Sequence, residues 1–124
     1  MASRNQGKRN RERGEEFERE CVRELHALGF TTARRTGSIQ ASGSGINDIA
    51  GFPGIWVSAK RWARKHRPLA FWSDAEARCP KDQIIMIIDR GDNKPATVQV
   101  RLADLVTLVE RLNDTLAISR RLEE

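Results

Sequence analysis

The segment spanning residues 47 to 60 constrains the fold more than any other part of the chain. It reads NDIAGFPGIWVSAK, in which two short apolar runs are separated by a Phe-Pro-Gly turn. Glycine and proline in this arrangement favour a tight reversal between two strands. The hairpin brings Asp48 and Lys60 to one end of a sheet, where a carboxylate and an ammonium group suit metal-assisted cleavage of a phosphodiester. One position does not fit, because Ser58 stands where a second carboxylate is expected.

Strand alternation divides the second half of this hairpin into two faces. One face carries Ile55, Val57 and Ala59, and the other carries Trp56, Ser58 and Lys60. We therefore expect the serine and the lysine to share a face next to Asp48. A lysine there would orient an attacking water and neutralise charge that develops on the phosphate. The alternative is a lysine on the surface of a strand with no chemical role.

Hydrophobic periodicity predicts the remaining elements. Helices are expected at about 14–28, 69–78 and 102–121, and strands at about 30–36, 46–51, 55–60, 83–89 and 96–100. The run at 83–89 is continuously apolar, which is typical of a central strand covered on both faces. The apolar stripe of the last helix is predicted to comprise Leu105, Leu108, Val109, Leu112 and Leu116. The order αβββαββα predicts an α/β protein with a mixed central β-sheet flanked by helices.

Length and charge bound the class of protein. A chain of 124 residues most simply forms one domain, which we place at 14–124 behind a basic, flexible arm at 1–13. The net charge is +5. Basic side chains gather in two places. The arm carries Arg4, Lys8, Arg9, Arg11 and Arg13, and a second cluster comprises Lys60, Arg61, Arg64, Lys65, His66 and Arg67. Both clusters flank the hairpin, which indicates a phosphate-backbone partner; the alternative is solvated charge on a tail and a loop.

The sequence also favours a cytoplasmic location. No apolar stretch approaches the roughly 20 residues needed to cross a bilayer, and no apolar segment follows the basic amino terminus as in a secretory signal. Cys21 and Cys79 form no CxxC pair and have no histidine at zinc-ligand spacing. We expect two reduced thiols, Cys21 in a helix core and Cys79 at a helix end.

Glu18 lies on the unexpected side of the first helix. At about 100° per residue, it falls inside the apolar arc formed by Phe17, Cys21, Val22, Leu25 and Leu28. An unpaired charge in such an arc costs several kcal/mol. Two compensations are open. The carboxylate joins Asp48 at a cation, or it pairs with Arg34 or Arg35 or reaches solvent.

Several motifs occur in order along residues 8 to 60: RGEEFERE at 13–20, Gly-Phe at 29–30, RTGS at 35–38, Asp-Ile at 48–49 and VSAK at 57–60. Together they resemble the Holliday junction resolvases of archaea and phages, within the PD-(D/E)XK nuclease superfamily. The resemblance implies a restriction-endonuclease-like fold, one or two Mg²⁺ ions (Mn²⁺ in their place), a homodimer and cleavage of four-way DNA junctions, in a bacterial cell or a phage-infected host.

The resemblance also assigns roles to residues. The catalytic residues it implies are Glu18, Asp48, Ser58 and Lys60, and the metal ligands are Glu18, Asp48 and the carbonyl of Ala59. Arg19 matches a family arginine beside the helix glutamate, and Ser38 lies where a loop serine contacts the scissile region. The DNA contacts expected from charge and resemblance together are Lys8, Arg9, Arg11, Arg13, Arg19, Arg35, Ser38, Arg61, Arg64, Lys65 and Arg67.

Ser58 departs from the family pattern, because a hydroxyl is a much poorer Mg²⁺ ligand than a carboxylate. Three explanations are open. Water fills the vacant position; a carboxylate from the second helix, Asp74 or Glu76, takes it; or the chain binds DNA without cutting it. The sequence therefore predicts a structure-selective endodeoxyribonuclease, with a non-catalytic branched-DNA-binding module as the alternative. A protein-interaction domain that uses the last helix is a third class.

Overall fold

A computed structural model describes residues 3–37, 47–62 and 68–123 of the chain. Within these residues, α-helices and strands follow one another in the predicted order, with a 3₁₀ turn before the last helix. The helices are α1 (Ser3–Ala27), α2 (Pro68–Arg78) and α3 (Leu105–Glu123), and the 3₁₀ turn is η2 (Leu102–Asp104). The strands are β1 (Arg34–Arg35), β2 (Ile49–Ala50), β3 (Ile55–Trp62), β4 (Ile84–Gly91) and β5 (Thr97–Gln99).

The strands form one mixed sheet in the order β1-β2-β3-β4-β5. The long strands β3 and β4 are parallel, and α2 makes the crossover that a parallel pair requires. The other neighbouring strands are antiparallel. The prediction of a mixed α/β protein with a central sheet flanked by helices is confirmed. The apolar strand β4 lies inside the sheet, between β3 and β5.

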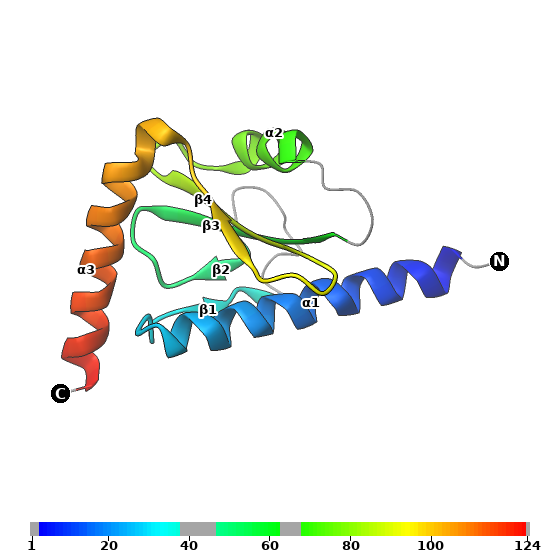
Figure 1. The fold of residues 1–124 in the computed structure, drawn as a ribbon, viewed down its shortest axis with the longest axis horizontal. Coiled ribbons are helices and arrows are strands. Elements are labelled where there is room, and N and C mark those ends of the chain that lie inside the picture. Colours follow the sequence, from blue (N-terminus) through cyan, green and yellow to red (C-terminus); the bar gives the residue numbers. More distant parts are fainter. Residues whose placement is uncertain (1–2, 38–46, 63–67, 124) are drawn as a thin grey trace.

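Helices cover both faces of the sheet, with α1 and α2 on opposite sides of the strands and α3 at one end (Figure 1). The core under α1 and α3 contains Phe17, Cys21, Leu25, Ile49, Ile55, Val57, Met86, Ile88 and Leu108. The core under α2 contains Trp56, Ala75, Ile85 and Ile87, with Phe71 and Trp72 against it. The predicted alternation of β3 is therefore confirmed, since Val57 faces α1 and its neighbour Trp56 faces α2.

The first helix is longer than predicted. It begins at Ser3, whereas the loss of apolar periodicity before Gly14 predicted an irregular arm. The residues of this extension are mostly Arg, Lys, Glu, Asn and Gln, and several of them are good helix formers. An ion pair between Lys8 and Glu12 at 4.0 Å adds i,i+4 support. Residues 3–13 thus continue α1 as a helix and do not form a separate irregular segment, and residues 7–9 and 11–13 of it are exposed.

The buried side of α3 also differs from the prediction. Leu108 is buried as expected, but Leu105 is 43% exposed and Val109 is 49% exposed. The helix instead turns Thr115 and Ser119 toward the body. The side chain of Leu116 lies close to Gly29, where an added Cβ would be only 3.2 Å from it, so this position favours glycine.

The sequence predicts Leu28 in the buried arc of the first helix, but its side chain is 70% exposed. The helix ends at Ala27, so Leu28 no longer follows the helical face that carries Phe17 and Leu25. The chain reverses at Gly29, whose φ of 107° favours glycine. The first strand is correspondingly short, because the residues between this reversal and Arg34 form a turn.

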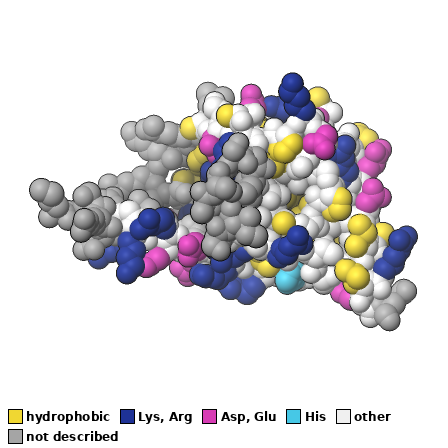
Figure 2. All heavy atoms as spheres, turned by 180° about the vertical axis from the view of Figure 1, so that it is seen from behind, with side chains coloured by type: hydrophobic (Ala, Val, Ile, Leu, Met, Phe, Trp, Pro, Cys, Tyr) yellow, Lys and Arg dark blue, Asp and Glu magenta, His cyan; other side chains and the backbone are white. Residues whose placement is uncertain are grey.

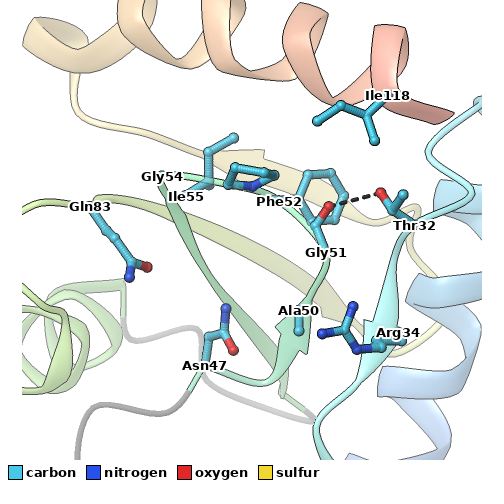
Figure 3. A pocket seen from close by; sticks show the side chains of 11 residues that line it. Thr32, Arg34, Asn47, Ala50, Gly51, Phe52, Gly54, Ile55, Gln83 and Ile118 are labelled. Carbon is cyan, nitrogen blue, oxygen red and sulfur yellow. Dashed lines mark hydrogen bonds between the residues drawn. The ribbon is translucent and has the colours of Figure 1, made fainter. Parts of the chain in front are cut away.

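The predicted reversal between β2 and β3 is confirmed by a hydrogen bond from the N–H of Ile55 to the carbonyl of Phe52 at 3.1 Å. Gly51 leads into this turn with a φ of 102°, and a Cβ there would lie 2.0 Å from the backbone oxygen of Thr32. The hydroxyl of Thr32 donates to the carbonyl of Gly51 at 2.8 Å (Figure 3). This close approach anchors the hairpin that carries Asp48.

Candidate active site

Asp48 lies immediately before β2 and is held in place by contacts with β3. Its N–H donates to the carbonyl of Val57 at 2.9 Å, which continues the strand ladder. Its carboxylate oxygen Oδ2 accepts the N–H of Ala59 at 2.8 Å and the hydroxyl of Ser58 at 3.3 Å. The residue is only 9% exposed. The aspartate is therefore held in one position by charge-assisted hydrogen bonds.

Glu18 reaches the same region from α1. Burial raises the pKa of its carboxyl group, and the negative charge of Asp48 raises it further. Arg35 of β1 opposes both effects, because its Nε lies 3.3 Å from the Glu18 carboxylate. Of the two compensations expected for this glutamate, the pairing with Arg35 is present. Glu18 also lies close enough to Asp48 for the two like charges to interact, and a cation between them stays a prediction.

Ser58 is fully buried, with 0% of its surface exposed. Its hydroxyl donates to Asp48, so the group that replaces the expected carboxylate stabilises the neighbouring negative charge instead of adding to it. A second carboxylate at this place would repel Asp48 unless a cation lay between them. The serine is thus compatible with the fold in the absence of a cation.

Lys60 lies on the same face of β3 but makes a different contact. Its Nζ is 3.3 Å from Oδ2 of Asp74 on α2, and Arg78 approaches the same oxygen at 3.4 Å. The serine and the lysine therefore share a face, as expected, but Asp48 contacts the serine while the lysine contacts the second helix. The sequence named Asp74 only as one of two acids that could replace the missing carboxylate.

The oxygen atoms near Asp48, from carboxylates and backbone carbonyls, are of the type that binds a hard divalent cation. Mg²⁺ prefers carboxylate and carbonyl oxygens, and a cation would relieve the repulsion that contributes to the raised pKa of Glu18. Over residues 3–37, 47–62 and 68–123, no three His, Cys, Asp or Glu side chains gather closely enough to hold a metal. Two carboxylates are therefore present where the family resemblance implies three.

Basic side chains accompany the site on α1. Figure 2 shows Lys and Arg side chains along the lower edge of the molecule, with Asp and Glu among them. Lys8, Arg9, Arg11, Arg13 and Arg19 are all exposed, and Arg19 approaches Glu15 at 3.9 Å. Their exposure suits contact with a phosphate backbone.

The other expected DNA contacts have different surroundings. Arg61 pairs with Asp92 at 3.2 Å. Arg35 pairs with Glu18, so Arg35 belongs to the site itself and not to an outer DNA-binding surface. Four expected contacts lie outside the described residues, namely Ser38, Arg64, Lys65 and Arg67.

A hollow of about 450 Å³ lies beside the hairpin turn (Figure 3). Its described lining includes the amides of Asn47 and Gln83, the guanidinium of Arg34 and the apolar side chains of Phe52 and Ile118. The described lining residues include no carboxylate, and the hydroxyl among them, that of Thr32, donates to the carbonyl of Gly51. The hollow adjoins Asp48 through its neighbour Asn47.

Both cysteine thiols have raised pKa values. Cys21 is 1% exposed, and burial raises the pKa of its thiol to about 12, which leaves it unreactive. Burial also raises the pKa of the Cys79 thiol. Both are free thiols, Cys21 in the core under α1 and Cys79 just past the end of α2, as the sequence predicted.

Comparisons of the chain with protein-family models, with curated proteins and with solved structures found no match. Among the helices that the structure describes, none combines the length and apolar character needed to span a membrane.

Proposed function

We propose that this chain is a Mg²⁺-dependent, structure-selective endodeoxyribonuclease of the Holliday junction resolvase type, with a restriction-endonuclease-like fold. One observation carries the proposal. Glu18 and Asp48, which come from two elements far apart in sequence, interact electrostatically beside a strand that presents Lys60 on the face of Ser58. The order of helices and strands and the mixed sheet agree with such a fold.

In this mechanism Glu18 and Asp48 hold the cation, with the carbonyl of Ala59 as a further ligand. The bound Mg²⁺ would polarise the scissile phosphate and lower the pKa of a coordinated water. Lys60 would orient the attacking water and stabilise the charge that develops on the phosphoryl oxygens. Arg35 keeps Glu18 in place before the cation binds, because its guanidinium partly compensates the buried carboxylate.

DNA is gripped in this proposal by the exposed basic residues of α1, which contact phosphates and carry no sequence information. A homodimer would place two such sites on the symmetric strands of a four-way junction, as the family resemblance implies. Because these contacts are electrostatic, junction affinity is expected to fall steeply with salt concentration.

Ser58 supports a second candidate function, that of a non-catalytic module that binds branched DNA. Its hydroxyl donates to Asp48, and Glu18 is paired with Arg35, so both carboxylates have protein partners without a metal. In this alternative the acidic residues keep the fold of the site but no longer support cleavage.

Cleavage of labelled DNA separates the two functions. Wild type, Ser58→Glu and the control Asp48→Asn are each incubated with a four-way junction and with linear duplex of the same sequence, with Mg²⁺, Mn²⁺ or EDTA. Metal-dependent nicking of the junction by wild type, absent in Asp48→Asn, supports the nuclease. Tight junction binding without nicking, together with nicking by Ser58→Glu, establishes the non-catalytic module.

A further inference from the structure

Alternation along β1 and β2 places Arg34 and Ala50 on the face of the sheet opposite α1. Their neighbours face α1, since Arg35 pairs with Glu18 and Ile49 belongs to the core under that helix. Arg34 and Ala50 are partners in the register of the two strands, and both line the hollow of about 450 Å³. The core under α2, on this same face, is made with residues of β3 and β4. The hollow therefore lies over the edge of the sheet, beside the part that α2 covers.

Polar side chains from three places in the chain meet at this hollow. Figure 3 shows Arg34 of β1, Asn47 just before β2 and Gln83 just before β4 turned toward the same space. Arg34 is exposed and makes no ion pair with any residue that the structure describes, in contrast to Arg35. Since the described lining contains this guanidinium and no carboxylate, the hollow favours a ligand with negative charge.

Apolar side chains border the other side of the hollow. Phe52 comes from the turn before β3, and Ile118 comes from α3 (Figure 3). Ile118 is 38% exposed although its side chain is apolar. An apolar wall with a few polar groups is typical of pockets that bind small ligands, and the volume lies within their usual range. The ligand that suits this lining has a flat apolar face, a hydrogen-bonding edge and an anionic group.

A nucleotide combines these three features. The face of its base packs against flat or apolar side chains, amide side chains form hydrogen bonds with the edge of a base, and a guanidinium binds phosphate. A base inside a duplex is stacked and paired, so it cannot enter a hollow of this kind. An unpaired nucleotide at a branch point enters at a much lower cost.

The hollow is continuous with the candidate active site along β2. Asn47 lines the hollow and directly precedes Asp48. Asp48 and Ala50 are two residues apart, which corresponds to about 6.5 Å along a strand. A DNA strand with one phosphate at Asp48 would therefore bring the adjacent nucleotide to the hollow, without any rearrangement of the described side chains.

We propose that the hollow binds one unpaired nucleotide of a branched DNA strand, with its phosphate at Arg34 and the edge of its base at Asn47 and Gln83. This inference rests on the proposed function, since it takes DNA as the ligand and names the feature of the substrate that is recognised. The exposed basic residues of α1 bind the phosphates of any duplex. Selectivity for branched DNA then comes from the hollow.

Binding of a short single strand tests the inference without cleavage. Isothermal titration calorimetry is carried out in EDTA with a thymidine tetranucleotide that carries a 5′-phosphate. Arg34→Gln is expected to weaken binding by about tenfold or more, the scale of one lost hydrogen bond to a charged group. Ala50→Leu, which fills the hollow and keeps its polar groups, is expected to weaken binding as well. The control Arg120→Gln removes the same charge from an exposed position of α3 and is expected to bind as wild type does.

Two results of this titration would overturn the inference. The first is equal affinity of wild type, Arg34→Gln and Ala50→Leu for the tetranucleotide. The second is thymidine monophosphate binding as tightly as the tetranucleotide, because the hollow would then be a site for a free nucleotide and not for a DNA strand. If Ala50→Leu melts far below wild type, Gln83→Leu takes its place, since it removes the amide and keeps a side chain of similar size.

Fluorescence of 2-aminopurine tests the same contact in a four-way junction. This base analogue emits more strongly when it leaves the base stack, and it is placed in turn at each position next to the branch point. Wild type and Arg120→Gln are expected to raise the emission at one of these positions. Arg34→Gln and Ala50→Leu are expected to bind the junction through α1 without this rise. A bound junction that shows no rise with wild type, or an equal rise with Ala50→Leu, contradicts the inference.

Failure of the inference is distinct from failure of the proposed function. Metal-dependent junction cleavage by wild type, together with tetranucleotide affinity that is unchanged in Arg34→Gln and Ala50→Leu, leaves the nuclease intact and rejects the hollow as a DNA site. Absence of cleavage by wild type, together with tetranucleotide affinity that depends on Arg34 and Ala50, rejects the nuclease. That second result supports the hollow as the strand-binding site of a non-catalytic module.

Discussion

Replacing Asp48 by Ala and by Asn separates its structural contribution from its role toward a cation. The carboxylate accepts the backbone N–H of Ala59 at 2.8 Å and the hydroxyl of Ser58 at 3.3 Å. Alanine removes the oxygen, Oδ2, that accepts both hydrogen bonds, and leaves the two donors without this partner. Asparagine keeps an oxygen that accepts the N–H of Ala59 but removes the negative charge that a cation needs.

The expected loss of stability follows from these contacts. A hydrogen bond to a charged group contributes about 1.5–3 kcal/mol, and the longer bond from Ser58 adds less. Removal of the charge that raises the pKa of Glu18 offsets part of the loss. We expect Asp48→Ala to lower the free energy of unfolding by about 2 kcal/mol, or roughly 6–12 °C in melting temperature for a domain of this size. Asp48→Asn is expected to lose less than about 1 kcal/mol.

Thermal unfolding followed by circular dichroism, without divalent ions, measures this difference, and Mn²⁺ titration of the same proteins measures cation binding. Both variants are expected to lose cation binding, whereas only the alanine variant loses much stability. An alanine variant that melts within about 2 °C of wild type would refute the hydrogen-bond argument. An asparagine variant that is as unstable as the alanine variant would show that the charge, and not the acceptor geometry, holds β2 to β3.

Three further predictions follow from the described contacts. Burial and the charge of Asp48 raise the pKa of Glu18 above its usual 4.5. The protonated Glu18 therefore contributes its full share of the free energy of unfolding below pH 4.5, and this share is lost as the pH rises through the raised pKa. Mg²⁺ should recover this loss, and Glu18→Gln should abolish both effects in melting curves between pH 4 and 8. Gly51→Ala should lower the free energy of unfolding by about 2 kcal/mol or more, since a Cβ there would lie 2.0 Å from a backbone oxygen, as chemical denaturation will measure. Arg11→Ala should weaken binding to all DNA sequences alike and reduce the salt slope of log K by about 1, whereas Arg120→Ala on α3 should leave the slope unchanged in fluorescence anisotropy.

The sequence predicted the order of the elements and both faces of β3, because apolar alternation is a local property of a strand. It did not predict the start of α1, since residues 3–13 have helical propensity without an apolar face. It also misplaced the buried side of α3. The apolar stripe of that helix is wider than the surface it covers, so Leu108 is buried while Leu105 and Val109 stay exposed.

The candidate site was predictable to a similar extent. The hairpin register placed Asp48 beside Ser58, and helical periodicity singled out Glu18 as an acid on an apolar face. The sequence did not predict the contact between Lys60 and Asp74, because the pairing of a strand with a later helix depends on how α2 packs and not on local spacing.

The central claim is that Glu18 and Asp48 bind one divalent cation between them. Anomalous scattering from crystals grown with Mn²⁺ tests it most directly. We predict an anomalous peak within about 2.0–2.5 Å of a carboxylate oxygen of each residue. Peaks only at other places on the protein, with Glu18 still paired to Arg35, would contradict the account.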